Sequence, residues 1–186
     1  MNGYSQARNA SGNLTVLPVT TGVESVELAD QFKNAMRRLT SSVAIIASRD
    51  GDDPVGMVAT AVVSVSTSPP ALLICINRSA SLHSPLMLSG RFSVNLLSTA
   101  HSDLVPVFAG QVKGAERFAH GHWEDIQGLP CLADAQSCLI CTLDKRLGYG
   151  THDVIIGRVD AVQFAEPINP LLWENGSPAI SARLTQ

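Results

Sequence analysis

An apolar stretch in the first half of the chain reads Gly56-Met57-Val58-Ala59-Thr60-Ala61-Val62-Val63-Ser64-Val65-Ser66-Thr67-Ser68-Pro69-Pro70. Its valines favour a β-strand, and the double proline marks the end of that strand. Thr60, Ser64 and Ser66 lie two or four residues apart, so on an undistorted strand their hydroxyls share one face. Short side chains beside backbone N–H groups suit a phosphate or the edge of a ring system, because long side chains would block close approach. A strand edge that faces solvent would carry the same hydroxyls, so the stretch alone leaves both interpretations open.

Short strands dominate the rest of the chain. Segments rich in Val, Ile and Ala, and bounded by Gly, Pro, Asp or Asn, predict strands at residues 42–48, 56–66, 71–77, 92–97, 137–144 and 153–164. Asp50-Gly51 is a hairpin signal between the first two of them. Helical spacing predicts an amphipathic helix over 27–39 and short helices over 81–88 and 98–108. The pattern favours a mainly β fold, a closed antiparallel barrel with small helices at its rim, over a βαβ architecture.

Length and composition set the domain count and exclude some partners. The chain has 186 residues, 45% of them hydrophobic, which suffices for the core of one domain. Residues 1–25 are rich in Asn, Ser, Thr and Gly and predict a flexible N-terminal arm, which leaves 26–186 as the domain. A net charge of −3 with scattered Lys and Arg argues against nucleic acid or an anionic membrane as partners.

Two further features bear on the compartment. The longest apolar runs, such as residues 71–76, are far shorter than the about 20 residues that span a bilayer. The first residues lack the pattern of a secretory signal, so we expect a cytoplasmic protein.

The four cysteines, Cys75, Cys131, Cys138 and Cys141, stand among apolar neighbours, and we expect them to pack in the core. The CxxC spacing of the last two lacks the second pair that a zinc site needs.

Two polar clusters follow the opening stretch. Asn77-Arg78-Ser79-Ala80-Ser81-Leu82-His83-Ser84 runs into a predicted helix, which Ser79 or Ser81 could cap and whose exposed N–H groups could bind an anion. Gly148-Tyr149-Gly150-Thr151-His152-Asp153 is a glycine-bounded turn that presents His152 before a strand. That imidazole could bind a cofactor or simply end a loop. Neither a Rossmann or Walker fingerprint nor a GxSxG elbow occurs in the sequence.

Taken in order, these segments resemble the short-chain flavin reductase family, the reductase components of two-component flavin-dependent monooxygenases. The matching motifs are the stretch 56–70, Cys75 to Ser81, Gly90-Arg91-Phe92-Ser93-Val94-Asn95-Leu96-Leu97, and Gly150-Thr151-His152 followed by Gly157. The resemblance implies an FMN-binding split barrel, antiparallel and Greek-key-like, that works as a homodimer. It also implies FMN, with FAD as an alternative, and NADH, with NADPH as an alternative.

The resemblance assigns roles to particular residues. The strand around Thr60 should line the isoalloxazine ring and ribityl chain, Asn77 and the residues from Ser79 to His83 should hold the ribityl chain or phosphate, and the segment from Phe92 should close the site. The cofactor-binding residues are then Ala59, Thr60, Ala61, Val62, Ser64, Val65, Ser66, Asn77, Ser79, Ala80, Ser81, Leu82, His83, Phe92, Val94 and Asn95. His152 should act on the nicotinamide side, as the catalytic residue and as a cofactor contact. The family often has Gly-Asp-His where this chain has Gly150-Thr151-His152, so an acidic partner of this kind is missing here.

The implied activity is reduction of FMN by hydride transfer from NADH, with release of the reduced flavin to a partner monooxygenase. Two alternatives stay open at this point. A flavin held permanently could reduce another acceptor, such as a ferric chelate or a corrin cobalt, or the barrel could bind flavin or haem without turnover. Phe108 and Phe118 could cover the flavin or belong to the core.

Overall fold

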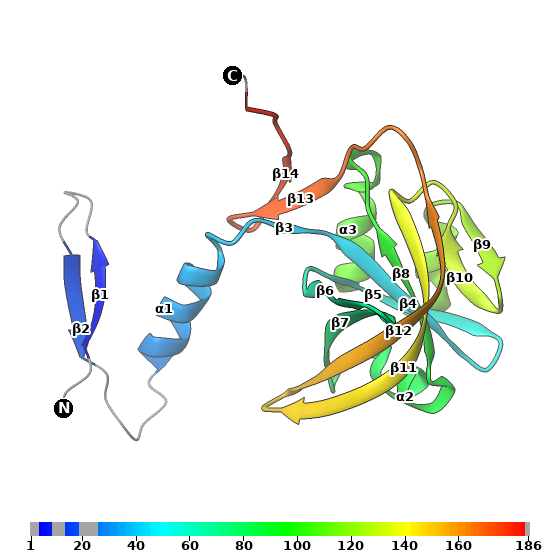
Figure 1. The fold of residues 1–186 in the computed structure, drawn as a ribbon, viewed down its shortest axis with the longest axis horizontal. Coiled ribbons are helices and arrows are strands. Elements are labelled where there is room, and N and C mark those ends of the chain that lie inside the picture. The colour runs from blue at the N-terminus through cyan, green and yellow to red at the C-terminus, as the bar shows by residue number, and fades with distance from the viewer. Residues whose placement is uncertain (1–3, 9–13, 19–25, 185–186) are drawn as a thin grey trace. The chain divides into compact units, whose positions relative to one another are not determined.

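The computed structural model describes residues 4–8, 14–18 and 26–184. The chain divides into two units, residues 1–38 and 39–186. In the first unit, strands β1 (Tyr4–Arg8) and β2 (Leu14–Pro18) pair antiparallel, and helix α1 spans Val26–Met36 (Figure 1). Helix α1 confirms a helix here, but it ends at Met36 and not at residue 39 as predicted. The predicted flexible arm, 1–25, falls partly on residues outside those described, and its described part is β1 and β2.

The second unit is built on a seven-stranded antiparallel sheet in the order β5-β4-β8-β11-β12-β7-β6. Its strands are β4 (Ala44–Asp50), β5 (Asp53–Ala59), β6 (Val62–Thr67), β7 (Pro70–Asn77), β8 (Arg91–Leu96), β11 (Ser137–Tyr149) and β12 (His152–Phe164). The two edge strands, β5 and β6, are consecutive in the chain, and only Thr60 and Ala61 join them. Such a short link draws the two edges together, so the sheet curls into a barrel (Figure 1). The predicted mainly β antiparallel barrel is confirmed.

Smaller elements surround this sheet. One three-stranded sheet contains β3 (Ser41–Ser42), β13 (Leu171–Glu174) and β14 (Ser177–Ile180), and β9 (Trp123–Ile126) pairs with β10 (Leu129–Leu132). The helical segments are α2 (His83–Ser89), η1 (Thr99–His101), α3 (Leu104–Pro106), η2 (Val107–Gln111) and η3 (Gly114–Ala119). The last four occupy the stretch between β8 and β9. Among the described residues, no helix is long and apolar enough to cross a membrane.

Several predicted boundaries were wrong. The strand predicted over 56–66 is two strands, because the chain leaves β5 at Ala59 and starts a new pairing, with β7, at Val62. The strand predicted over 137–144 continues to Tyr149, because its partner β12 continues to pair with it as far as His152. The Asp50-Gly51 turn is confirmed: Asp50 pairs with Asp53, and Gly51 adopts the positive φ of +60° that glycine accepts readily.

The helix predicted over 81–88 is α2, which begins at His83. Its N-cap is Leu82, without a side-chain hydrogen bond, so neither Ser79 nor Ser81 caps it. The stretch predicted as one helix over 98–108 is a series of short helical turns. The sequence analysis also missed the β13–β14 hairpin, whose turn, Asn175-Gly176, has positive φ at both residues.

Strand β4 is buried on both faces, because its side chains enter two different cores. Ala44 and Ile46 lie inside the barrel with Phe92 and Ile155, whereas Ile45 packs with residues of α3 and η2 such as Leu104 and Phe108. Cys131, Cys138 and Cys141 are buried as predicted. Cys75 departs from the prediction, since it is only half-buried.

Candidate functional site

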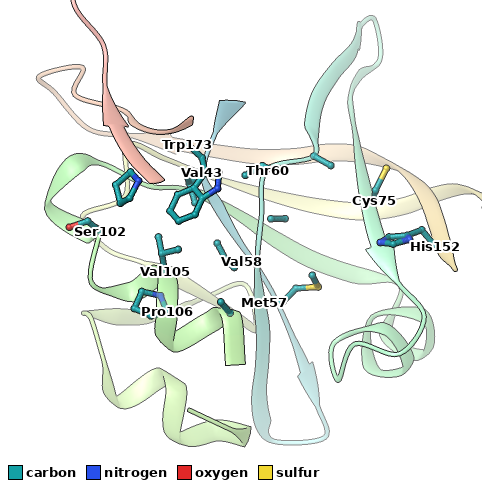
Figure 2. A pocket seen from close by; sticks show the side chains of 14 residues that line it. Val43, Met57, Val58, Thr60, Cys75, Ser102, Val105, Pro106, His152 and Trp173 are labelled. Atoms are coloured by element: carbon teal, nitrogen blue, oxygen red, sulfur yellow. The ribbon is translucent and has the colours of Figure 1, made fainter. Parts of the chain in front are cut away.

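A cavity of about 510 Å³ opens beside the link between β5 and β6. Its lining comes from the end of β5 and the link, from β7 and β12, from the segment around α3, and from the β13–β14 hairpin. The lining residues are Val43, Met57, Val58, Ala59, Thr60, Ala61, Cys75, Ser102, Val105, Pro106, Ala109, His152, Trp173 and Pro178. In Figure 2, His152 and Cys75 lie on one side of the cavity, and Ser102, Val105 and Pro106 lie on the other.

The backbone of Thr60 and Ala61 lies between the pairing of β5 with β4 and the pairing of β6 with β7. Ala59 is the last residue of β5 to pair with β4, and Val62 is the first residue of β6 to pair with β7. The N–H of Val62 donates to the carbonyl of Thr60 at 3.1 Å, which closes the link. The side chains here are small, so a flat ligand can approach the main chain closely.

A second cavity, of about 320 Å³, shares Met57, Val58 and Ala109 with the first. Its other lining residues are Ala80, Ser81, Phe108 and Arg117. The guanidinium of Arg117 is held in place, because its Nε donates to the carbonyl of Val112 at 2.7 Å and its Nη1 to that of Gly56 at 2.6 Å. A fixed cation therefore lines the same cavity as Ser81.

His152 is the first residue of β12 and is exposed to solvent at the first cavity. Its Nδ1 lies 2.9 Å from the hydroxyl oxygen of Thr151. Thr151 thus supplies a hydrogen-bond partner where a carboxylate would have supplied a charge. The predicted position of His152, directly after a tight turn, is confirmed.

The next residue, Asp153, faces the opposite side of β12, and only 1% of its side chain is exposed. Its Oδ2 accepts a hydrogen bond from Nε2 of His83 at 2.7 Å, and its Oδ1 accepts one from Nε of Arg78 at 3.0 Å. Nε of Arg146 lies 3.6 Å from Oδ2. The His83 hydrogen bond, followed by the Arg78 contacts, holds the pKa of Asp153 below its usual range and outweighs the opposing effect of burial.

Six of the predicted cofactor-binding residues line the two cavities. Ala59, Thr60, Ala61 and His152 line the first, and Ala80 and Ser81 line the second. The structure therefore brings the opening stretch, the polar cluster 77–84 and the turn before His152 to one region of the barrel, although they are far apart in the sequence.

The β6 residues in the prediction lie outside both cavities. Val62 packs against the barrel core, and Ser64, Val65 and Ser66 are exposed. The register with β7 shifts between Ser64 and Ser66, so these hydroxyls do not continue one face from Thr60. The predicted common face is wrong, because it assumed a strand without a break or a bulge.

Other predicted residues have internal partners. The carboxamide oxygen of Asn77 accepts hydrogen bonds from the N–H and the hydroxyl of Ser79, both at 2.9 Å. His83 is bound to Asp153, and Leu82, Phe92 and Val94 are fully buried in the barrel core. None of these residues lines either cavity.

Asn95 was predicted to close the site, and the structure places it in the interior. Its Nδ2 donates to the carbonyl of Ile45 at 3.1 Å and to the hydroxyl of Ser93 at 3.0 Å, and its Oδ1 accepts from the N–H of Leu132 at 2.8 Å. The side chain therefore joins β8 to β4 and β10. A buried amide must satisfy its polar atoms, and here protein groups satisfy them.

The sequence analysis missed several lining residues, above all Arg117 and Trp173. The Asn175-Gly176 turn signal could have revealed the hairpin that carries Trp173. No comparable local signal marks Arg117. Phe108 and Phe118 pack with Trp123 at ring separations of 4.8 to 5.5 Å, which makes them core aromatics, with Phe108 also bordering the second cavity.

Comparison with known proteins identifies the family. The profile of the flavin reductase like domain matches residues 36–180. The chain belongs to this family. The residues that the match covers include both cavities, so the flavin reductase domain contains the whole candidate site.

The names of similar proteins support the assignment to the flavin reductase family. FMN reductase (NADH) RutF of Methylorubrum populi is 39% identical over 146 residues, which cover 78% of this chain and 72% of the relative. The reductase component of the FADH(2)-dependent resorcinol hydroxylase of a Rhizobium species is 38% identical over 151 residues, covering 80% and 84%. The crystal structure of a flavin reductase domain protein from an Arthrobacter species superposes with a TM-score of 0.79 at 29% identity, covering 85% and 98%. The split-barrel prediction is confirmed.

Proposed function

We propose that this protein is an NADH-dependent reductase that reduces FMN and releases it to a flavin-dependent monooxygenase. The observation that carries the proposal is the cavity at Ala59, Thr60 and Ala61, with His152 at one side and a second cavity adjoining it. Two relatives, 39% and 38% identical to this chain over the aligned residues, bear the names of an NADH-dependent FMN reductase and of a hydroxylase's reductase component.

The residues present fit a flavin mononucleotide. Ligand cavities commonly measure about 300 to 1,000 Å³, and the larger cavity falls within that range. Small side chains at Ala59 and Ala61 leave room for a flat ring against the main chain, while Met57, Val58 and Val105 provide apolar walls. Ser81 and Arg117 supply a hydroxyl and a fixed cation for a phosphate in the adjoining cavity.

The protein's task in this proposal is alignment. Bound FMN supplies the hydride acceptor. The link at Thr60 and Ala61 would hold the ring, the apolar walls would exclude water, and His152, oriented by Thr151, would position the nicotinamide. Hydride transfer itself requires no proton from a side chain, so the missing carboxylate at residue 151 is compatible with activity.

An open site suits a flavin that must leave after reduction. The first cavity opens to solvent beside exposed His152, and the second borders the surface loop that carries Ser81. We therefore propose that FMN is a substrate that exchanges in each turnover. FAD and NADPH are the proposed alternatives to FMN and NADH.

The proposed reaction is tested by following NADH oxidation by the purified protein with FMN, FAD or riboflavin added in turn. We expect turnover that saturates with FMN and is absent without flavin, and we expect dialysis to remove the flavin. Flavin that stays bound in a stoichiometric amount through dialysis would favour reduction of another acceptor. Flavin binding without turnover with NADH or NADPH would overturn the reductase proposal.

We also propose a homodimer in the cytoplasm. Edge strand β6 exposes Val63 and Val65, and the end of β11 exposes Leu147 and Tyr149, so a second copy could cover apolar surface. The four thiols are free, as is usual in a reducing compartment. Sedimentation analysis should give twice the chain mass, and Val65→Lys should shift it toward one chain. A wild-type monomer at micromolar concentration would contradict the dimer.

A further inference from the structure

We propose that Asp153 is a positioning residue that holds the loop between β7 and α2 in the shape that presents Ala80 and Ser81 to the flavin phosphate. The inference rests on the proposed function, because it assigns that loop to the phosphate. It concerns a residue that touches neither cavity and that the sequence analysis did not single out.

The two oxygens of one carboxylate hold the two ends of the loop. Oδ1 of Asp153 accepts from Arg78, the first residue after β7, and Oδ2 accepts from His83, the first residue of α2. The carboxylate that accepts both hydrogen bonds is almost fully buried, so these charge-assisted bonds constrain the loop more strongly than pairs between two exposed side chains would.

Main-chain hydrogen bonds complete the loop between these two anchors. The N–H of Arg78 donates to the carbonyl of Thr151 at 3.0 Å. Within the loop, the N–H of Ala80 donates to the carbonyl of Asn77 and that of His83 to the carbonyl of Ala80, each at 3.0 Å. Ala80 and Ser81, which line the second cavity, therefore lie on a segment fixed at both ends.

The start of β12 connects the two halves of the candidate site. His152 and Asp153 are adjacent, and side chains alternate between the faces of a strand. His152 accordingly faces the first cavity, while Asp153 faces the loop. One strand end thereby sets where the nicotinamide-side histidine lies relative to the phosphate-side loop.

Charge balance explains why the loop depends on this carboxylate. Arg78 and Arg146 both approach Asp153, and both guanidinium groups are about half exposed. Without the carboxylate, the two cations would repel each other across the start of β12. The position of the Arg78 guanidinium also depends on Gly148, because a Cβ at residue 148 would overlap Nη2 of Arg78.

The test compares Asp153→Asn with Asp160→Asn in the full chain. Asp160 is a matched control: it lies on the same strand and likewise accepts hydrogen bonds from two side chains, here the hydroxyl of Thr142 and the guanidinium of Arg158. We expect Asp153→Asn to raise the KM for FMN about tenfold, with kcat at saturating FMN within about twofold of wild type. The KM for riboflavin, which has no phosphate, should change little, and Asp160→Asn should behave as wild type.

Two results would overturn the inference. One is an unchanged KM for FMN in a folded Asp153→Asn protein, and the other is an equal rise in KM for FMN and riboflavin, which would indicate a general disturbance of the fold. If Asp153→Asn does not fold, Gly148→Ala serves instead, since it displaces the Arg78 guanidinium and keeps every charge. Gly148→Ala should raise the KM for FMN selectively, and a wild-type KM would count against the proposal.

Failure of the proposed function would look different. In that case the wild-type protein itself would not oxidise NADH with any flavin. Quenching of flavin fluorescence would then still compare the affinities of wild type, Asp153→Asn and Asp160→Asn for FMN and riboflavin. A selective loss of FMN affinity in Asp153→Asn supports the positioning role, and equal affinities in all three proteins reject it.

Discussion

The ring of Phe92, on β8, lies against the backbone of Gly157, on β12. A Cβ at residue 157 would overlap Cζ of Phe92 and would lie 3.1 Å from Cε1 of the same ring and 3.3 Å from Cβ of Cys141. Both Phe92 and Gly157 are buried, and the strand between theirs is β11. The largest side chain inside the barrel therefore fits because the facing residue on β12 has no side chain.

We predict that Gly157→Ala destabilises the protein by about 1 to 3 kcal/mol, the usual cost of overpacking a filled core. Urea denaturation followed by fluorescence measures the change. Phe92→Leu makes room at the same place, so the double variant should lose less stability than the sum of the two single variants. Additive losses would show that the ring and the glycine do not interact.

Asn95→Ala should lower stability and leave flavin binding intact. The substitution removes the acceptor of the Leu132 N–H and the donor to the Ile45 carbonyl, both in the interior, and an unpaired buried group costs about 1 to 3 kcal/mol. Urea denaturation gives the stability, and a steady-state assay at low temperature gives the KM for FMN. A stable variant with a raised KM would instead return Asn95 to the flavin site.

His152→Ala should slow the reaction without abolishing it. Because hydride transfer needs alignment and no side-chain acid, we expect kcat/KM for NADH to fall about tenfold, a loss of about 1.4 kcal/mol in transition-state stabilisation. Steady-state rates at varied NADH measure the change. His120→Ala removes an exposed imidazole outside both cavities and serves as the control. Complete loss of activity in folded His152→Ala protein would give the histidine a chemical role.

Asp153 should make the protein sensitive to acid. Its pKa is depressed in the folded state, chiefly by the His83 hydrogen bond, whereas an aspartate in an unfolded chain titrates near about 3.9. The folded state therefore binds this proton less readily than the unfolded state does. The stabilisation is fully present above the unfolded pKa and is lost as the pH falls through the folded pKa.

Denaturation midpoints between about pH 5 and about pH 2, a range that brackets the aspartate pKa of the unfolded chain, test this prediction. Wild-type stability should decline toward the acid end, and Asp153→Asn, which cannot take up this proton, should decline less steeply. If the stability of the two proteins declines equally as the pH falls, a group other than Asp153 causes the loss of stability in acid.

Local sequence signals sufficed for much of the barrel. Asp50-Gly51 predicted its hairpin, because the turn conformation depends on the residues in the turn itself. The glycine-bounded turn before His152 was predicted for the same reason. Strand β7, from Pro70 to Asn77, was also predicted, because its apolar run is bounded by prolines on one side and by Asn77 on the other.

The faces of the strand after Thr60 could not be read in this way. Ser64 and Ser66 keep the spacing of one face, yet the break at Thr60 and Ala61 and the register shift on β6 turn them away from the cavities. Where a chain changes partner strands depends on the partners, and the partners are not neighbours in the sequence.

The class of fold followed from local features of the sequence, because strand periodicity, turn residues and apolar content act over a few residues. The sequence also determined the order in which the Thr60 stretch, the Ser81 loop and the His152 turn occur. The contacts of Asp153 with His83 and Arg78, which lie 70 and 75 positions away, and the meeting of Arg117 and Ser81 at one cavity could be seen only in the folded chain. Such contacts arise when the sheet closes, and closure depends on the burial of the whole core rather than on any local pattern.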